Sequence, residues 1–211
     1  MAISIQNSRF FGYAACIISY AIMAFSCTGK GFTSDEAALI KSSDTLMRVL
    51  TIKDSTDLKI LRAQSSDLPA SALMSDEYEK LCRLMISTVT HPSQDGVGIA
   101  GPQVGLNRRV IAVQRFDKEG FPFEVYPNIR IVWASDSLAC GPEGCLSVPD
   151  MRGDVMRSTE IVIEYTDMEQ LEGRRGSCPM PVIRDTVKGF TAVIFQHETD
   201  HLDGILYTDR L

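Results

Sequence analysis

The sequence Q-H-E-T-D-H at 196–201 constrains this chain more than any other stretch, because it contains two of the protein's three histidines. On a helix, His197 and His201 would project from the same face. Glu198 lies beside the first of them, which gives the H-E-x-x-H pattern of two imidazoles on one metal ion and a carboxylate placed to handle a proton. The apolar residues 189–195 predict a buried helix leading into this motif. The alternative is an ordinary pair of surface histidines at helical spacing.

A cysteine in the middle of the chain is a candidate for a third ligand. Cys145 lies in the glycine- and proline-rich stretch 141–149, which predicts a tight loop. In such a place a cysteine is usually just a small buried residue. Together with His197 and His201, however, its thiolate would leave a fourth position for water, which is the arrangement of a catalytic metal centre.

The composition is that of a globular chain with a core. A length of 211 residues fits one domain plus an appendage, with 45% hydrophobic and 23% charged residues. The formal net charge is −6 and no basic block occurs, which argues against a direct nucleic-acid partner. The six cysteines contain no C-x-x-C pair and no dense framework, which argues against a disulfide scaffold.

The N-terminal residues 1–27 form a hydrophobic segment that predicts export or membrane anchoring. Residues 1–34 contain no acidic side chain, and residues 10–25 are apolar except for one glycine and one serine. A basic start, an apolar middle and small residues before Cys27 are typical of a secretory signal peptide. The alternatives are an uncleaved anchor, which would associate with a membrane through this apolar run, and an amphipathic targeting stretch. Residues 28–45, rich in Gly, Ser, Thr and charge, predict a linker.

The remaining pattern predicts strands in the middle of the domain and a helix at each end. Ser75 can cap a helix that extends to about residue 91. Residues 46–61 predict a short strand or a turn. Longer strands are predicted over four ranges, 109–114, 123–132, 160–165 and 178–186, the second interrupted at Pro127-Asn128. The glycine-rich stretch 96–103 would let the backbone approach a ligand closely.

Three separated stretches together resemble the signature motifs of one enzyme family, the peptide deformylases. They are G-V-G-I-A-G-P-Q at 96–103, E-G-C-L-S at 143–147 and Q-H-E-T-D-H at 196–201, in the family's order. The similarity covers roughly residues 46–211, which would be the catalytic domain. It implies an α+β fold with antiparallel sheets around a central metal-bearing helix. It also implies an enzyme that removes the N-terminal formyl group from formyl-methionyl peptides and releases formate.

The resemblance implies a role for each matching residue. The metal ligands would be Cys145, His197 and His201. Glu198 would be the general acid/base, and the oxyanion would be stabilised by the side-chain amide of Gln103 and the backbone N–H of Leu146. Five further residues would bind the substrate, two along its backbone, one near the peptide entrance and two at the methionine side chain: Val97 and Gly98, Arg152, and Phe190 and Val193.

The resemblance also implies a cofactor and partners. The cofactor would be one divalent metal ion, ferrous iron first, with zinc, nickel or cobalt as alternatives. The partners would be formyl-methionyl peptides and, through them, nascent chains at the ribosome. The family's role is cytoplasmic, whereas residues 1–27 predict export or anchoring, so the sequence leaves the compartment open.

Two other functions fit part of the pattern. A zinc endopeptidase with the longer H-E-x-x-H-x-x-G-x-x-H motif would need a histidine at position 207, where Tyr207 stands. A non-catalytic, surface-anchored binding module with a decayed metal site is the second alternative. Decay would be expected to remove a catalytic Glu early, yet Glu198 is present.

Overall fold

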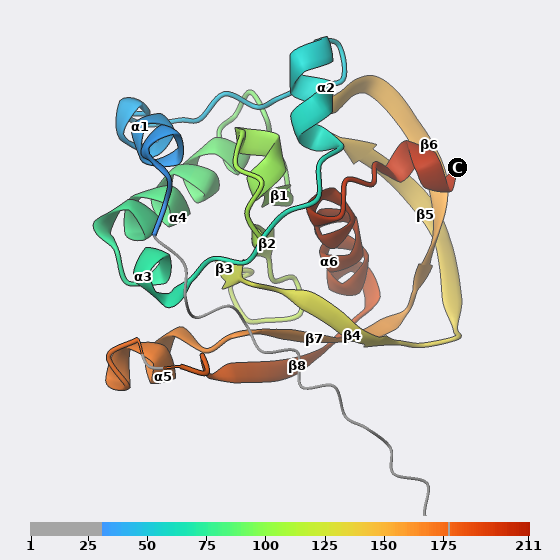
Figure 1. Ribbon diagram of the computed structural model, residues 1–211. Helices are drawn as coiled ribbons and strands as arrows, with labels where there is room; N and C mark the ends of the chain where they lie inside the picture. Colours follow the sequence, from blue (N-terminus) through green and yellow to red (C-terminus); the bar gives the residue numbers. More distant parts are fainter. Residues whose placement is uncertain (1–30, 177) are drawn as a thin grey trace, which may run out of the picture.

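The computed structural model of the protein describes residues 31–176 and 178–211. Helix α6 (Gly189–Leu202) lies in the middle and packs against strands of three antiparallel sheets, as Figure 1 shows. Ala192, Phe195 and Leu202 of this helix are buried, which explains its central place, because a helix that is apolar on most sides must be covered on most sides. The predicted α+β fold with antiparallel sheets around a central helix is confirmed.

The three sheets are short and antiparallel throughout. The first pairs β1 (Gly98–Ala100), β2 (Val110–Gln114) and β3 (Phe123–Pro127) in that order. The second has the order β4 (Arg130–Ala134), β7 (Glu160–Thr166) and β8 (Val182–Lys188). The third is the long hairpin of β5 (Leu138–Cys145) and β6 (Val148–Ser158).

The strand predicted over 123–132, with an interruption at Pro127-Asn128, is two strands, β3 and β4, which belong to different sheets. The chain turns at Asn128, whose φ is 56°. Asparagine tolerates this left-handed backbone better than most residues. Its buried side chain accepts from the N–H of Leu68, and donates to the carbonyl of Leu68 and to the hydroxyl of Thr166. The break therefore lies at a residue whose side chain ties three segments together.

The helices outside the centre cover the first sheet and the edges of the molecule. They are α1 (Ser34–Ser42), α2 (Ser55–Leu61), α3 (Ala70–Leu73), α4 (Asp76–Val89) and α5 (Met168–Gly173), with the 3-10 helices η1 (Gly101–Val104) and η2 (Tyr207–Arg210). The predicted helix after Ser75 is α4, and the Ser75 hydroxyl accepts from the N–H of Tyr78. Its buried face, Leu81, Leu84, Met85 and Val89, belongs to the main core cluster.

The linker predicted over 28–45 is wrong for residues 34–42, which form α1. Thr33 and Glu36 make a capping box, and Ile40 is buried. The carboxylate of Glu36 also accepts from Arg108, with the shorter bond 2.6 Å long. The polar residues that indicated a linker are thus the helix cap and its anchor to the domain.

The short strand or turn predicted over 46–61 is wrong for residues 55–61, which form α2. Asp54 is the N-cap and accepts from the N–H groups of Thr56 and Asp57. The strand predicted over 178–186 is β8, which begins at Val182 and ends at Lys188.

The hydrophobic segment predicted over residues 1–27, with its membrane association through residues 10–25, lies outside the described residues. Within the ranges that the structure describes, no helix is both long and apolar enough to span a bilayer.

Candidate metal centre

Helix α6 places both histidines of the H-E-x-x-H motif on one buried face. The rings of His197 and His201 lie 5.1 Å apart between centroids, and the two residues are 9% and 1% exposed. Tyr207 of η2 packs on the His197 ring at 6.0 Å, with the two planes inclined by 22°. At the position where an endopeptidase would need a third histidine, this chain therefore has a buried tyrosine that packs on His197.

The β5–β6 hairpin brings Cys145 to the two histidines. Its Sγ lies 3.2 Å from Nε2 of His201, and the ligand atoms of all three residues lie within 4.8 Å of one another. The loop predicted around Cys145 is instead the end of β5, and the pairing register with β6 shifts between Glu143 and Cys145. Such an irregularity bends the strand and re-aims its side chains.

The carboxylate of Glu198 lies against the backbone of Gly98. Glu198 is 4% exposed, and its Oε2 has no hydrogen-bond partner among the residues that the structure describes. A Cβ atom added to Gly98 would lie 2.5 Å from Oε1 of Glu198. At this glycine the close approach that the structure shows is to the Glu198 carboxylate, which any larger residue would displace.

The predicted oxyanion donors lie beside Cys145. Gln103 is buried, and its Oε1 accepts from the N–H of Ala100 at 2.8 Å. Its Nε2 lies 3.2 Å from the hydroxyl of Ser147 and 3.5 Å from Sγ of Cys145. Leu146 follows directly in the chain, and its side chain packs against the main core cluster. The hydrogen bond from Ala100 thus holds the side-chain amide of Gln103 next to the Cys145 sulfur.

A cavity of about 790 Å³ contains this constellation, and we call it the substrate cavity. Its wall includes the five residues predicted to bind substrate, namely Val97, Gly98, Arg152, Phe190 and Val193, together with Gln103, Cys145, Leu146, His197 and Glu198. His201 is not on the wall and lies behind it. The structure therefore brings together every predicted site residue from three stretches of the chain, 97–103, 145–152 and 190–201.

The donor set fits a divalent transition metal. One thiol and two imidazoles are ligands that iron, zinc and related ions accept, and ligation requires the thiolate and neutral imidazoles. His197 has its Nδ1 engaged by a carboxylate oxygen of Glu143 at 2.8 Å, which leaves Nε2 to face the other ligands. The unpartnered Oε2 of Glu198 is the buried acceptor that a reacting group in the cavity would meet.

Comparison with known proteins identifies the family. The family model described as Polypeptide deformylase matches residues 47–211. A peptide deformylase of Leptospira biflexa is 35% identical over 159 residues, which cover 72% of this chain and 82% of that protein. The chain belongs to the peptide deformylase family. It is therefore an enzyme that removes the N-terminal formyl group from formyl-methionyl peptides, and the family binds a metal ion.

Solved structures of the peptide deformylase family have the same fold. A class I type b peptide deformylase of Acinetobacter baumannii with Met-Ala-Ser bound has a TM-score of 0.67 and 31% identity, and the match covers 80% of this chain and 100% of that one. The peptide deformylase of Thermotoga maritima has a TM-score of 0.65 and 28% identity, and the match covers 80% of this chain and 99% of that one. The function expected from the resemblance is confirmed, which leaves the endopeptidase and the binding module without support from these comparisons.

The pKa values at the site of this deformylase-family protein reflect both burial and charged neighbours. Burial opposes the charge on Glu143, but hydrogen bonds from Arg157 and His197 outweigh it and lower its pKa to about 2. Burial is the largest influence on Glu198 and raises its pKa to about 7. The pKa of His201 is held well below its ordinary value, chiefly by burial and then by the charge of His197. At neutral pH an ionised carboxylate thus stands behind His197, while burial favours the neutral form of His201.

Some residues of the site were not predicted from the sequence. Ile194 lines the substrate cavity one turn after Phe190, whereas Phe190 itself is 57% exposed and packs on Phe116 at its mouth. The helical spacing could have indicated Ile194. Glu143 lies inside the E-G-C-L-S motif, and its contact with His197 was also missed. No local signal points to Arg157, because its partners lie far from it in the sequence.

Proposed function

We propose that Cys145, His197 and His201 hold one divalent metal ion, with ferrous iron as the preferred ion and zinc, nickel or cobalt as alternatives. The observation that carries the proposal is the convergence of these three ligand atoms within 4.8 Å beside the buried Glu198 carboxylate. When bound, such an ion supplies Lewis acidity and an activated water at neutral pH. The remaining chemistry is the work of the chain's own side chains.

Glu198 is the proposed general acid/base. Its Oε2 is free to accept, and the residue neighbours a ligand without being one. In this proposal Glu198 takes the proton of the attacking water and delivers it to the nitrogen that leaves as the new amino terminus. Proton transfer by a positioned side chain contributes about 10²–10⁴-fold to a rate.

Gln103 and Leu146 are the proposed oxyanion donors. The Nε2 of Gln103 lies beside the sulfur of Cys145, and the N–H of Leu146 follows that residue in the chain. As the formyl carbonyl becomes tetrahedral, these donors would meet the developing negative charge. The loss of one such donor typically costs about 2.7–4 kcal/mol of transition-state stabilisation. Because Oε1 of Gln103 is fixed by Ala100, its amide group is already oriented.

The peptide is proposed to lie along β1 with its methionine side chain toward α6. Val97 and Gly98 would follow the substrate backbone, and Arg152 would stand at the entrance. Phe190 and Val193 would contact the methionine side chain. An apolar pocket discriminates modestly, by about 1–3 kcal/mol for each methylene group.

Two proposals about the protein's surroundings rest on the sequence and the reaction alone. Formylated chains would reach the enzyme as nascent chains at the ribosome, with no direct contact to nucleic acid. Residues 10–25 would associate with a membrane or act as a signal. Fractionation of cells that express the chain with and without residues 1–27 tests the second proposal, since loss of the segment should move the protein out of the membrane fraction.

The central test is release of formate from formyl-Met-Ala. Protein loaded anaerobically with iron should release formate. The rates of the zinc-, nickel- and cobalt-loaded forms, measured in the same assay, show which metal supports the highest activity. The Glu198→Ala variant should bind the metal equally well and release almost no formate. Full metal binding by a Cys145→Ala variant would contradict the proposed ligand set.

A further inference from the structure

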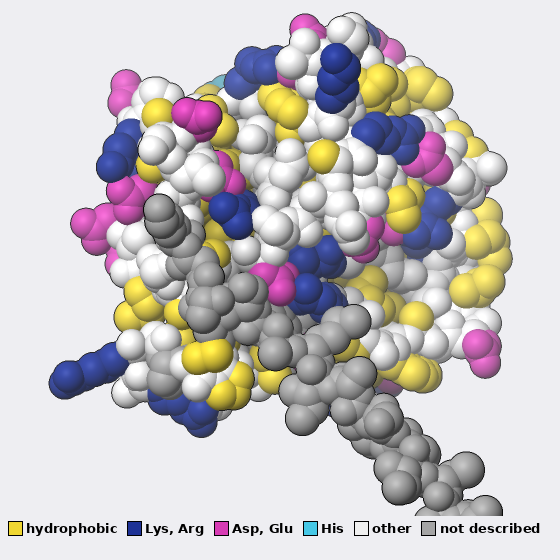
Figure 2. Space-filling view, viewed as in Figure 1, with side chains coloured by type: hydrophobic (Ala, Val, Ile, Leu, Met, Phe, Trp, Pro, Cys, Tyr) yellow, Lys and Arg dark blue, Asp and Glu magenta, His cyan; other side chains and the backbone are white. Residues whose placement is uncertain are grey.

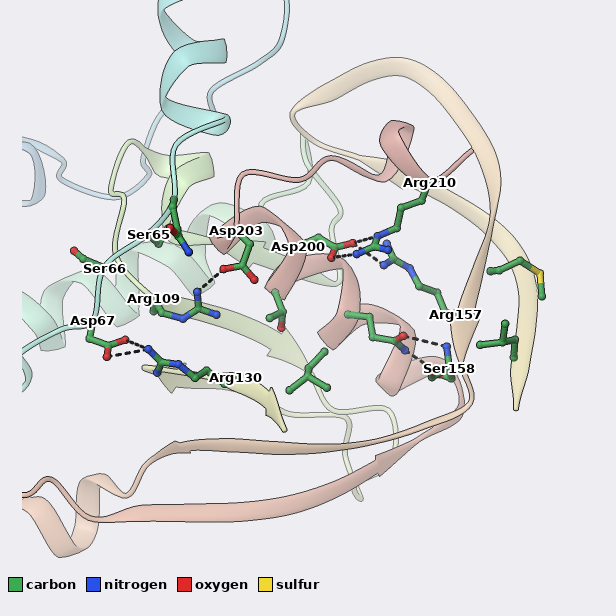
Figure 3. Close-up of a pocket in the computed structure, with 16 residues that line it drawn as sticks. Ser65, Ser66, Asp67, Arg109, Arg130, Arg157, Ser158, Asp200, Asp203 and Arg210 are labelled. Atoms are coloured by element: carbon green, nitrogen blue, oxygen red, sulfur yellow. Dashed lines mark hydrogen bonds and ion pairs between the residues drawn. The ribbon is translucent and has the colours of Figure 1, made fainter. Parts of the chain in front are cut away.

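A row of charged side chains, buried except at its outer end, begins at the metal centre and crosses to the other face of α6. It consists of Glu143, Arg157, Asp200 and Arg210, and we call it the charge array. Arg157 donates to both oxygens of Glu143, at 2.7 and 3.0 Å, and to Asp200 at 2.6 Å. Arg210 donates to both oxygens of Asp200 at 2.5 Å. Figure 3 shows the two arginines converging on Asp200.

The inner end of the charge array contacts a proposed metal ligand. Oε2 of Glu143 accepts from Nδ1 of His197 at 2.8 Å and also from Arg157 at 3.0 Å. A ligating histidine needs its second nitrogen held in this way, because the bond fixes both the tautomer and the orientation of the ring. Glu143 in turn is clamped by two parallel bonds from a planar guanidinium, the geometry that allows least rotation.

The outer end of the charge array lines a second cavity, of about 770 Å³, which we call the polar cavity. Helix α6 separates the two cavities: His197 and Glu198 face the substrate cavity, whereas Asp200 and Asp203 face the polar cavity. Basic and acidic side chains are interspersed on the face of the molecule shown in Figure 2. The side chain of Arg210 is 42% exposed, while that of Arg157 is 4% exposed.

Stability alone is a poor explanation for the charge array. Burying a charged side chain removes its hydration and costs several kcal/mol. Buried ion pairs are therefore often no more stabilising than apolar residues of similar volume. Glu143 and Arg157 are 7% and 4% exposed, so both carry this cost. The array does fix orientation, because Glu143, Arg157 and Asp200 each have a hydrogen-bonding partner on two sides. The inner carboxylate is therefore held in one orientation at the back of His197.

We propose that Arg157, held from behind by Asp200 and Arg210, is a positioning residue of the metal centre, which it serves by fixing Glu143 against His197. The inference rests on the metal site proposed above. It predicts that damage to the array weakens metal binding, with an effect that decreases from Arg157 outward. Loss of a partner behind a metal-ligating histidine typically costs about 10–100-fold in metal affinity.

The test compares two isosteric changes, one in α6 and one at the residue that caps its C-terminus. Asp200→Asn removes the charge that holds Arg157, whereas Asp203→Asn removes a carboxylate that accepts from Arg109, outside the array, at 2.6 Å. Arg157→Lys keeps the charge of the inner member and loses its two-pronged geometry. For the full chain and each variant, cobalt affinity is measured by competition with a chelator. The visible absorption spectrum of bound cobalt and the thermal midpoint of the metal-free form are also recorded.

We expect Arg157→Lys to weaken cobalt binding by about 10–100-fold and to alter the cobalt spectrum, with a smaller change of the same kind in Asp200→Asn. Asp203→Asn should bind cobalt within about twofold of the wild type. Should Arg157→Lys not fold, Arg210→Gln at the more exposed end gives the same readout. Equal effects of Asp200→Asn and Asp203→Asn, or lower thermal midpoints with unchanged affinity and spectrum, would overturn the inference alone. Failure of the wild type to bind cobalt would overturn the proposed metal site and the inference with it.

Discussion

Replacement of Gly98 by alanine is the sharpest test of the site geometry, because it adds a single methyl group. That methyl would lie 2.5 Å from Oε1, 2.9 Å from Cδ and 2.9 Å from Cγ of Glu198. Ordinary contact begins at 3.4 Å, so the carboxylate oxygen must move by the difference of 0.9 Å. Both residues are buried between β1 and α6, so the movement must take the carboxylate away from its present position.

The size of the effect follows from that displacement. A misplacement of about 1 Å in a reacting group costs about 10²-fold in rate. We therefore expect kcat/KM for formyl-Met-Ala to fall about 100-fold in Gly98→Ala, equivalent to about 2.7 kcal/mol. Formate release measures the rate. Metal content is measured in parallel and should stay unchanged, because none of the three proposed ligands touches the added methyl among the contacts nearest to it.

Gly141→Ala is the matched control. Gly141 lies on β5, and a Cβ added there meets nothing within 4 Å. This variant should retain activity within about twofold. If Gly98→Ala kept wild-type kcat/KM while a structure showed Glu198 in its present position, the packing argument would be refuted.

Three other perturbations probe the site and the fold. Glu198→Gln should retain its metal and lose about 10²–10⁴-fold in kcat, measured by formate release. Removing a metal present at 100 times its dissociation constant should cost about 2.7 kcal/mol of stability, which lowers the thermal midpoint by about 5 to 11 °C. In the Cys145→Ser variant, a chelator should remove the metal faster than from the wild type. Burial opposes the charge on Glu36, but the hydrogen bond from Arg108 outweighs it and lowers its pKa below the ordinary 4.5. The stabilisation from Glu36 is therefore present above pH 4.5 and lost as the pH falls through the lower folded pKa, so the difference in thermal midpoint between the wild type and Glu36→Gln should be largest near neutral pH and shrink in acid.

Local patterns in the sequence predicted the elements that depend on local chemistry. The cap at Ser75 and the spacing of Leu81, Leu84 and Met85 were sufficient for α4. The two histidines at helical spacing, with an apolar run before them, were sufficient for α6. Both helices are positioned by apolar residues that lie close together in the sequence, on one face of α4 and on most sides of α6.

The errors arose where one residue type has two uses. Thr33 and Glu36 form a capping box, and Asp54 caps α2, yet the same residues are common in linkers and turns. Only burial of Ile40 against the domain decides for the helix, and burial is a long-range property. Arg157 was missed for the same reason, since Asp200 is 43 residues away in the chain.

The three ligand atoms come from two elements that the chain makes at different times. Cys145 and His201 are 56 residues apart, with β6, β7, α5 and β8 between them. At synthesis rates of about 5–20 residues per second, the thiol exists for roughly 3 to 11 s before its imidazole partner is translated. Until α6 has been made it cannot cover the sulfur, so we expect newly made chains to be more sensitive to oxidants than finished ones. Peroxide added during synthesis should therefore inactivate a larger share of the molecules than the same dose added afterwards.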